Sequence, residues 1–149
     1  MKKTPLQYAL DLLALRDRTE AEMRKKMSEK DVPAREITSA ILFLKSKDFL
    51  DDARFVKNYI NSQRRQCRFG KYRILNKIKT LGVSGDLVAE AESELSFDDE
   101  FARAVEVGKK CLSKNIAAEK KYERLCRHLS SRGFGYDIIK KTVEELLEK

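Results

Sequence analysis

Three cysteines and one histidine are the residues of this 149-residue sequence that could supply a thiolate nucleophile or a soft-metal site. The thiols of Cys67, Cys111 and Cys126 are odd in number and include no Cys-x-x-Cys pair, which argues against a disulfide framework or a structural zinc site. Cys126 and His128 lie two residues apart, a spacing that places them on different faces of a helix. We therefore predict reduced thiols and no metal site.

Sequence motifs that support other catalytic chemistry are also missing. The chain contains no glycine-rich phosphate-binding string, no His-Glu-x-x-His zinc motif and no Gly-x-Ser-x-Gly nucleophile turn. We predict that the protein is not an enzyme, that it uses no cofactor and that it has no small-molecule substrate. A hydrolase that uses Cys126 or His128 is the alternative.

Lysine and arginine offer a different chemistry, the binding of polyanions, and they are unevenly distributed. The chain carries 32 Lys and Arg against 24 Asp and Glu, a formal net charge of +8. Seven basic residues and no acidic one lie between Arg64 and Lys79, and eight basic residues with two acidic ones lie between Lys109 and Arg132. The segment from Asp86 to Glu106 holds eight acidic residues and one arginine, and is expected to meet a basic partner.

The two basic segments are candidates for contact with nucleic acid or with an acidic partner, because lysines and arginines that neutralise phosphates release condensed counterions. Phe69, Tyr72 and Tyr122 lie among the bases and could stack on unpaired nucleobases. The alternative is a solvated helix face with aromatic side chains packed inward. The candidate residues are Arg64, Arg65, Arg68, Lys71, Arg73, Lys77, Lys79, Lys120, Lys121, Arg124 and Arg127.

The composition is typical of an all-helical protein. Charged residues make up 38% and hydrophobic residues 42% of the chain, with six glycines, two prolines and no tryptophan. The longest apolar runs, such as residues 40–44, fall far short of the roughly 20 residues that span a bilayer. We expect a cytoplasmic monomer with no membrane association.

A repeat of 51 residues organises the chain. Two successive shifts by that length align residues 21–44 with 72–95 and with 123–146 without a gap, and apolar residues recur at matching helical positions. Asp31 in the first copy corresponds to glycines 82 and 133, where a left-handed residue would end one helix and let the chain turn back. Each copy therefore predicts a helix, a tight turn and a second helix.

Helix start signals support this pattern. Residues 19–22 form a capping box, Gly70 takes the same cap position in the second copy, and Ser84 can cap the helix that follows the glycine turn. One further helix is expected before each pair.

These first helices are predicted over residues 6–14, over residues 53–66 with Asp51 as the cap, and over residues 100–112 with Asp98 as the cap. We predict an all-α fold, in which three tandem three-helix repeats form an elongated, curved array within one domain, residues 1–149. The predicted repeats cover residues 5–46, 50–95 and 97–148.

Several short segments, in order and in phase with the repeat, carry a family resemblance. They are residues 9–23, 50–56, 70–74, 81–83 and 129–134, of which Leu50-Asp51-Asp52-Ala53-Arg54-Phe55-Val56 is the most recognisable. Together they resemble the bacterial RecX regulatory proteins over essentially the whole chain. The chain departs from that family at Lys77, where members often carry an acid, and at Leu81, where they often carry a lysine.

The resemblance implies a non-catalytic modulator of the RecA recombinase. Proteins of this family associate with the filament that RecA forms on single-stranded DNA, lie in its helical groove and usually restrain its ATPase, strand exchange and induction of the SOS response. The implied partners are the RecA filament and single-stranded DNA, contacted directly or through the filament.

A helix-turn-helix transcription factor is the competing interpretation, because a glycine turn between two helices is common to both. In such a protein the third helix of a unit would read the major groove. Residues 87–95 carry three glutamates, whose charges would repel phosphates.

Overall fold

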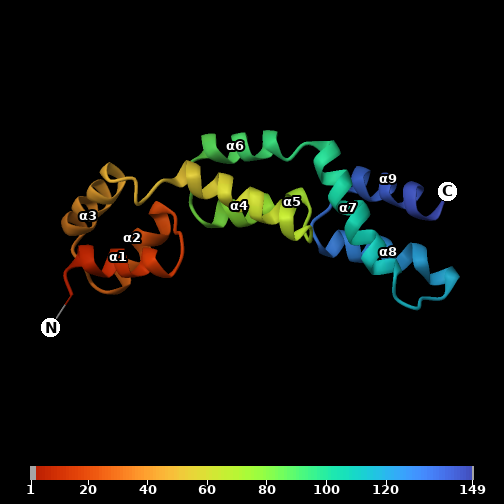
Figure 1. The fold of residues 1–149 in the computed structure, drawn as a ribbon, viewed down its shortest axis with the longest axis horizontal. Helices are drawn as coiled ribbons and strands as arrows, with labels where there is room; N and C mark the ends of the chain where they lie inside the picture. The colour runs from red at the N-terminus through yellow and green to blue at the C-terminus, as the bar shows by residue number, and fades with distance from the viewer. Residues whose placement is uncertain (1–2, 149) are drawn as a thin grey trace.

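The computed structural model describes residues 3–148, which form nine helices joined by short loops and contain no strand (Figure 1). Met1, Lys2 and Lys149, at the ends of the predicted domain, lie outside the described residues. The helices are α1 (Pro5–Leu15), α2 (Glu20–Glu29), α3 (Ala34–Ser46), α4 (Asp52–Gln66), α5 (Lys71–Thr80), α6 (Gly85–Glu94), α7 (Phe97–Leu112), α8 (Ala118–Ser131) and α9 (Tyr136–Leu147). Within this range, no helix combines the length and the apolar character that crossing a bilayer requires.

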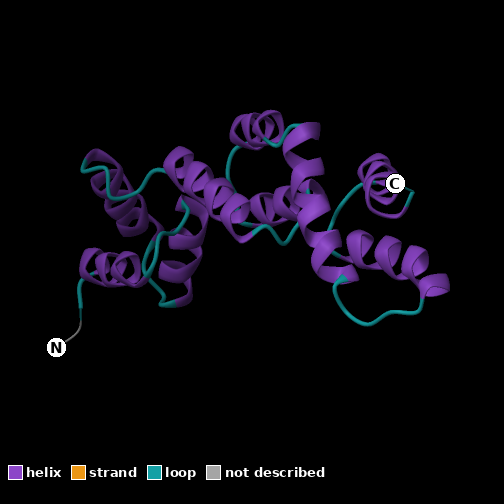
Figure 2. Cartoon of the chain, turned by 45° about the vertical axis from the view of Figure 1, so that its right-hand side comes forward, coloured by secondary structure: helices purple, strands orange, loops and turns teal. Residues whose placement is uncertain are grey.

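Each set of three consecutive helices encloses a hydrophobic core of its own, and we call these sets unit 1 (α1–α3), unit 2 (α4–α6) and unit 3 (α7–α9). The units follow one another along the long axis of the molecule (Figures 1 and 2). The predicted all-α fold of three tandem three-helix repeats is confirmed. Fully buried core side chains include Met23, Met27, Ile41 and Leu44 in unit 1, Ile60, Ile74, Ile78 and Leu95 in unit 2, and Leu125 and Leu129 in unit 3.

Left-handed residues end the second helix of every unit, as the repeat predicts. The φ angles are 59° at Asp31, 80° at Gly82 and 90° at Gly133. After each of these residues the chain reverses into the third helix of the unit. The helix–turn–helix pattern within each copy is therefore confirmed.

Most predicted helix starts are confirmed, and one is wrong. Thr19 forms a capping box with Glu22, and Ser84 and Asp51 cap α6 and α4 with their side chains. Asp98, however, does not cap α7, because the hydroxyl of Ser96 accepts the amide hydrogen of Asp99 and the helix begins three residues earlier than predicted. The acidic residues then fall in the first turn, where the helix dipole favours their negative charge.

Candidate nucleic-acid and partner interface

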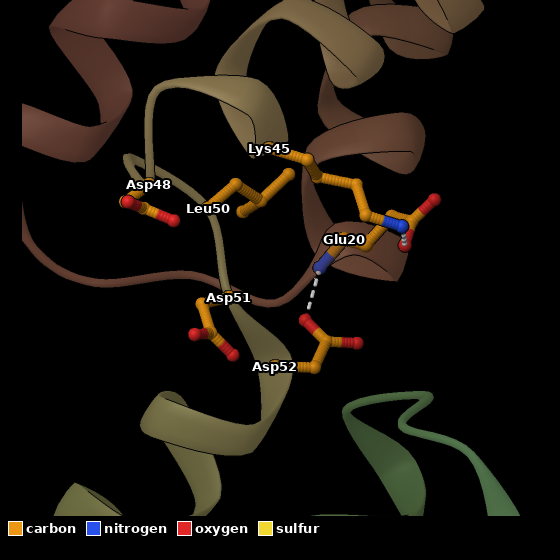
Figure 3. A pocket seen from close by; sticks show the side chains of 6 residues that line it. All are labelled: Glu20, Lys45, Asp48, Leu50, Asp51 and Asp52. Carbon is orange, nitrogen blue, oxygen red and sulfur yellow. Dashed lines mark hydrogen bonds and ion pairs between the residues drawn. The ribbon is translucent and has the colours of Figure 1, made fainter.

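The basic helices are positioned by two junctions, at which the N-terminus of one unit's second helix packs against the next unit. At the first junction, between units 1 and 2, the buried hydroxyl of Thr19 donates to the carbonyl oxygen of Leu81 at 2.7 Å. The backbone N–H of Glu20, the first residue of α2, donates to Asp52 Oδ1 at 2.8 Å (Figure 3). Lys45 Nζ lies 3.4 Å from Glu20 Oε2 on the same side.

At the second junction, between units 2 and 3, the N-terminus of α5 packs against unit 3 in the same way, but most of the hydrogen bonds join backbone groups. The N–H of Gly70 donates to the carbonyl of Arg132 at 2.8 Å, and the N–H of Tyr72 donates to the carbonyl of Gly133 at 3.2 Å. The N–H of Lys71, the first residue of α5, donates to Glu100 Oε2 at 2.8 Å. Helices α2, α5 and α8 therefore follow one another head to tail along the molecule (Figure 1).

Buried charges surround the second junction. Arg103 is 3% exposed, and its guanidinium pairs with Asp99 and donates to the carbonyl of Phe69 at 3.1 Å. Glu100 is 5% exposed, and burial raises the pKa of its carboxyl above the ordinary value although Lys71 and Arg103 oppose the shift. Part of the acidic segment, which was expected to meet a basic partner, is thus neutralised inside the molecule.

The structure distributes the eleven candidate residues along α4, α5 and α8. Arg64 and Arg65 lie in the last turn of α4, Arg68 in the loop after it, Lys71, Arg73, Lys77 and Lys79 on α5, and Lys120, Lys121, Arg124 and Arg127 on α8. Because α5 and α8 meet end to end, the two groups form one row and do not face each other.

Four of these candidates are engaged by other groups of the protein. The contacts are Arg64 Nε to Asp99 Oδ1 at 3.2 Å, Lys71 Nζ to Glu92 Oε1 at 3.7 Å, Arg127 Nη2 to Glu123 Oε1 at 2.6 Å, and the guanidinium of Arg73 over the ring of Phe69 at 4.0 Å. Arg64 also donates to the carbonyl of Glu94 at 2.7 Å, which makes it a structural residue of the α4–α6 contact.

The other candidates make no ion pair among the described residues, and all but the half-buried Lys121 are exposed. Tyr72 and Tyr122 are also exposed, whereas Phe69 is half-buried beneath Arg73. The surface that remains available to a polyanion is therefore smaller than the basic segments indicate.

The structure adds basic residues that the sequence patterns did not select. Lys25 and Lys26 of α2 share a surface hollow of about 330 Å³ with Lys77 across the first junction, and two glutamates of α2 also line it. These lysines were missed because α2 carries as many acidic as basic residues and so has no excess of positive charge. Lys110 and Arg132 join Arg68 at another pocket, beside the second junction.

Comparison with known proteins agrees with this architecture unit by unit. Family profiles described as the first, second and third three-helix domains of RecX match residues 6–44, 51–91 and 98–143. The chain belongs to the RecX family. Each RecX profile falls on one of the three units.

Curated relatives carry the name "Regulatory protein RecX". Those from Clostridioides difficile and Bacillus licheniformis are 33% and 29% identical over 93% and 96% of this chain, and the chain spans 66% and 55% of their lengths. The relative from Pasteurella multocida is 33% identical, with 90% of this chain and 82% of that protein covered. The crystal structure of RecX from Lactobacillus salivarius matches with a TM-score of 0.82 over 95% of this chain and 94% of that one, at 21% identity, which shows the shared fold.

Proposed function

We propose that this chain is a non-catalytic regulator that binds the RecA filament on single-stranded DNA and restrains its ATP hydrolysis, strand exchange and induction of the SOS response. Membership of a family whose relatives are named regulatory proteins supports a regulatory role. The observation that carries the proposal is the head-to-tail row of α2, α5 and α8. On α5 and α8 this row includes exposed cations that make no ion pair among the described residues, namely Lys77, Lys79, Lys120 and Arg124.

The junctions hold the helices of this row in fixed positions, which favours the binding of a long polyanion. Backbone hydrogen bonds of 2.8 to 3.2 Å join α5 to α8, and so fix the distance between the cations of the two helices. A repeating filament presents phosphates and acidic groups at regular intervals, and a fixed row of cations can meet several of them without ordering a flexible linker. An elongated molecule with small, open hollows suits such a surface better than it suits a small substrate.

The third helix of unit 2 argues against the helix-turn-helix alternative. This helix is α6, where Asp86, Glu90 and Glu94 are all exposed and Lys71 pairs with only the remaining glutamate, Glu92. A recognition helix with this charge would be repelled by the DNA backbone. Selection from random duplex oligonucleotides is expected to enrich no sequence.

The direct test is the ATPase activity of RecA on single-stranded DNA, measured with increasing amounts of the protein and combined with co-sedimentation of the filament. We expect hydrolysis to fall as the protein binds. The double variant Lys77→Gln/Lys79→Gln removes two exposed, unpaired cations of the row and should weaken filament binding by about tenfold, since each phosphate contact contributes about one unit to the salt slope.

The matched control is Arg35→Gln/Lys57→Gln, which also removes two charges. Arg35 on α3 and Lys57 on α4 are both exposed and lie outside the row. This control should bind nearly as well as the wild type. Unchanged hydrolysis together with no co-sedimentation of the wild-type protein would refute the proposal.

A further inference from the structure

The second junction creates a pocket of about 400 Å³ that neither adjoining unit contains alone. Unit 2 contributes Arg68 from the loop after α4. Unit 3 contributes Lys110 and Lys114, from the last turn of α7 and the loop after it, and His128 and Arg132 from the end of α8. The fold of unit 3 brings the ends of α7 and α8 together, and the junction adds Arg68 of unit 2 to them.

Four cations line this pocket and no acidic residue does: Arg68, Lys110, Lys114 and Arg132. Among the described residues none of the four takes part in an ion pair. The neighbouring Lys109, by contrast, has its ammonium 3.7 Å from Glu106 and does not line the pocket. Positive charge is therefore gathered here without a paired carboxylate among the described residues. The two acids whose charges act on Cys67 are Glu106 and Asp99, and both are paired with cations outside the pocket.

Helix ends explain how such a cluster is tolerated. Arg68, Lys110, Lys114 and Arg132 all lie at or just beyond the C-termini of α4, α7 and α8. The partial negative charge of a helix C-terminus favours a nearby cation, typically by a few tenths of a kcal/mol to about 1 kcal/mol. Partial charges offset only part of four full ones, and the pocket stays electropositive.

The pKa of His128 is sensitive to the positive charges of the pocket. Burial lowers the pKa of its imidazole below the ordinary value, and the charges of Arg132 on its own helix and Lys114 after α7 lower it further. The remaining cations that line the pocket are Arg68 and Lys110. Unit 2 also contributes the thiol of Cys67 to the lining. Burial raises the pKa of the Cys67 thiol, whose sulfur lies 3.9 Å from the carbonyl oxygen of Arg103.

We propose that this pocket binds a phosphate group of a single-stranded nucleic acid. Arginine and lysine together provide the forked and the point-charge donors that phosphate oxygens accept. A continuous strand is favoured over a free nucleotide because Lys121 and Arg124 precede His128 by seven and four residues, and so extend the same helix face away from the pocket. This inference rests on the proposed function for its biological ligand, while the pocket itself rests on the contacts described above.

The test measures binding of a fluorescently labelled oligothymidylate by anisotropy across a range of salt, without RecA. The variant Lys110→Gln/Lys114→Gln changes two exposed lysines and should weaken binding about tenfold or more and lower the salt slope by about two. Lys109→Gln, next to it on the same helix, should change neither by a comparable amount. Unchanged thermal melting of both variants excludes misfolding as the cause.

The single histidine of the chain provides a second readout. NMR titration of the imidazole of His128 should show its pKa rise when the oligonucleotide is bound, because a phosphate opposes the field of the four cations. Thymidine monophosphate alone should produce this rise only at far higher concentration. A full rise with the mononucleotide and none with the oligonucleotide would assign the pocket to a free nucleotide and overturn the proposal.

Other outcomes separate this proposal from the proposed function. If wild type binds no oligonucleotide, or if Lys110→Gln/Lys114→Gln binds it as tightly as Lys109→Gln does, the phosphate site is wrong, whatever happens to RecA. If Lys110→Gln/Lys114→Gln loses oligonucleotide binding while the wild type neither changes RecA hydrolysis nor co-sediments with the filament, the phosphate site stands and the proposed regulatory function is refuted.

Discussion

The first and second junctions share one hydrogen bond from a helix N-terminus to a carboxylate of the next unit, and they differ in the other groups that make contact. At both, the first amide of a second helix donates to a carboxylate on the first helix of the next unit, Asp52 in one case and Glu100 in the other, at 2.8 Å. At the first junction the other hydrogen bond between the units, among the described residues, is donated by the neutral hydroxyl of Thr19. At the second, backbone meets backbone at Gly70, and the charged side chain of Arg103 is buried beside it.

The turn of unit 1 shows why glycine occupies the other two turns. Asp31 has a φ of 59°, which an aspartate can adopt, and its side chain is exposed. A Cβ at Gly82 would lie 2.5 Å from Ala21 Cβ, and one at Gly133 would lie 2.5 Å from Arg73 Cβ. Contact between units, more than the left-handed conformation itself, therefore requires glycine.

The largest effect is expected from Gly70→Ala. The φ of Gly70 is −85°, so alanine causes no backbone strain, but its Cβ would lie 2.5 Å from the carbonyl oxygen of Gly133 and 2.6 Å from the nitrogen of Phe134. Since both neighbours are backbone, the second junction must separate, and the free energy of unfolding should fall by about 3 kcal/mol. Urea denaturation followed by circular dichroism measures the change.

Gly85→Ala is the control for this substitution. An added Cβ at Gly85, the first residue of α6, meets no atom within 4 Å. Alanine there should leave stability unchanged or raise it by up to about 1 kcal/mol, because it restricts the unfolded chain. Equal stability of the two variants would contradict the close backbone contact at the second junction.

The next largest effect is expected at Arg103, the buried charged residue of the second junction, and it can be compared with that at the neutral Thr19 of the first. Arg103→Met removes the cation next to Glu100 and the donor to the carbonyl of Phe69, and should lower the free energy of unfolding by about 2 to 3 kcal/mol. Asp99 keeps Arg64 as a partner, which limits the loss. Chemical denaturation of this variant measures it.

Thr19→Val is the counterpart at the first junction. It removes a neutral hydrogen bond and a helix cap and should cost about 1 kcal/mol. If Thr19→Val destabilises the protein more than Arg103→Met does, the stronger dependence of the second junction on side-chain charge is wrong.

The sequence predicts features that depend on neighbours along the chain. The capping box at Thr19 and the left-handed turns at Gly82 and Gly133 depend on residues within about four positions, and all three are found. The predicted cap of α7, Asp98, is wrong because Ser96, two residues earlier, caps the helix instead, and serine and aspartate have similar capping strength.

Features that depend on contacts between units escaped prediction. Arg64 looked like a binding residue because the segment around it is basic, but its partner Asp99 lies 35 residues away. Arg68 and Lys110 share a pocket only because two units meet there. No periodic pattern links such positions, so the pocket at the second junction could be found only from the structure.

The smallest effect is a difference in pH dependence between Glu100 and Glu22. Burial raises the pKa of Glu100 above its ordinary 4.5, so its contribution to folding is complete below pH 4.5 and is lost as pH rises through the folded pKa. Burial alone would also raise the pKa of Glu22, but hydrogen bonds with Arg16 and the N–H of Thr19 lower it, so this contribution is present above 4.5 and is lost as pH falls.

Glutamine at either position is neutral at all pH values and can still accept the backbone hydrogen bond. The stability of Glu100→Gln relative to the wild type should therefore rise as the pH increases from 4 to 7, whereas that of Glu22→Gln should fall over the lower part of this range. Asp52→Asn should follow Glu100→Gln in sign with a smaller slope, because burial also raises the pKa of Asp52 but its side chain is only half-buried. Urea titrations at several pH values measure the slopes, and equal slopes for Glu100→Gln and Glu22→Gln would show that burial does not govern the carboxylate of the second junction.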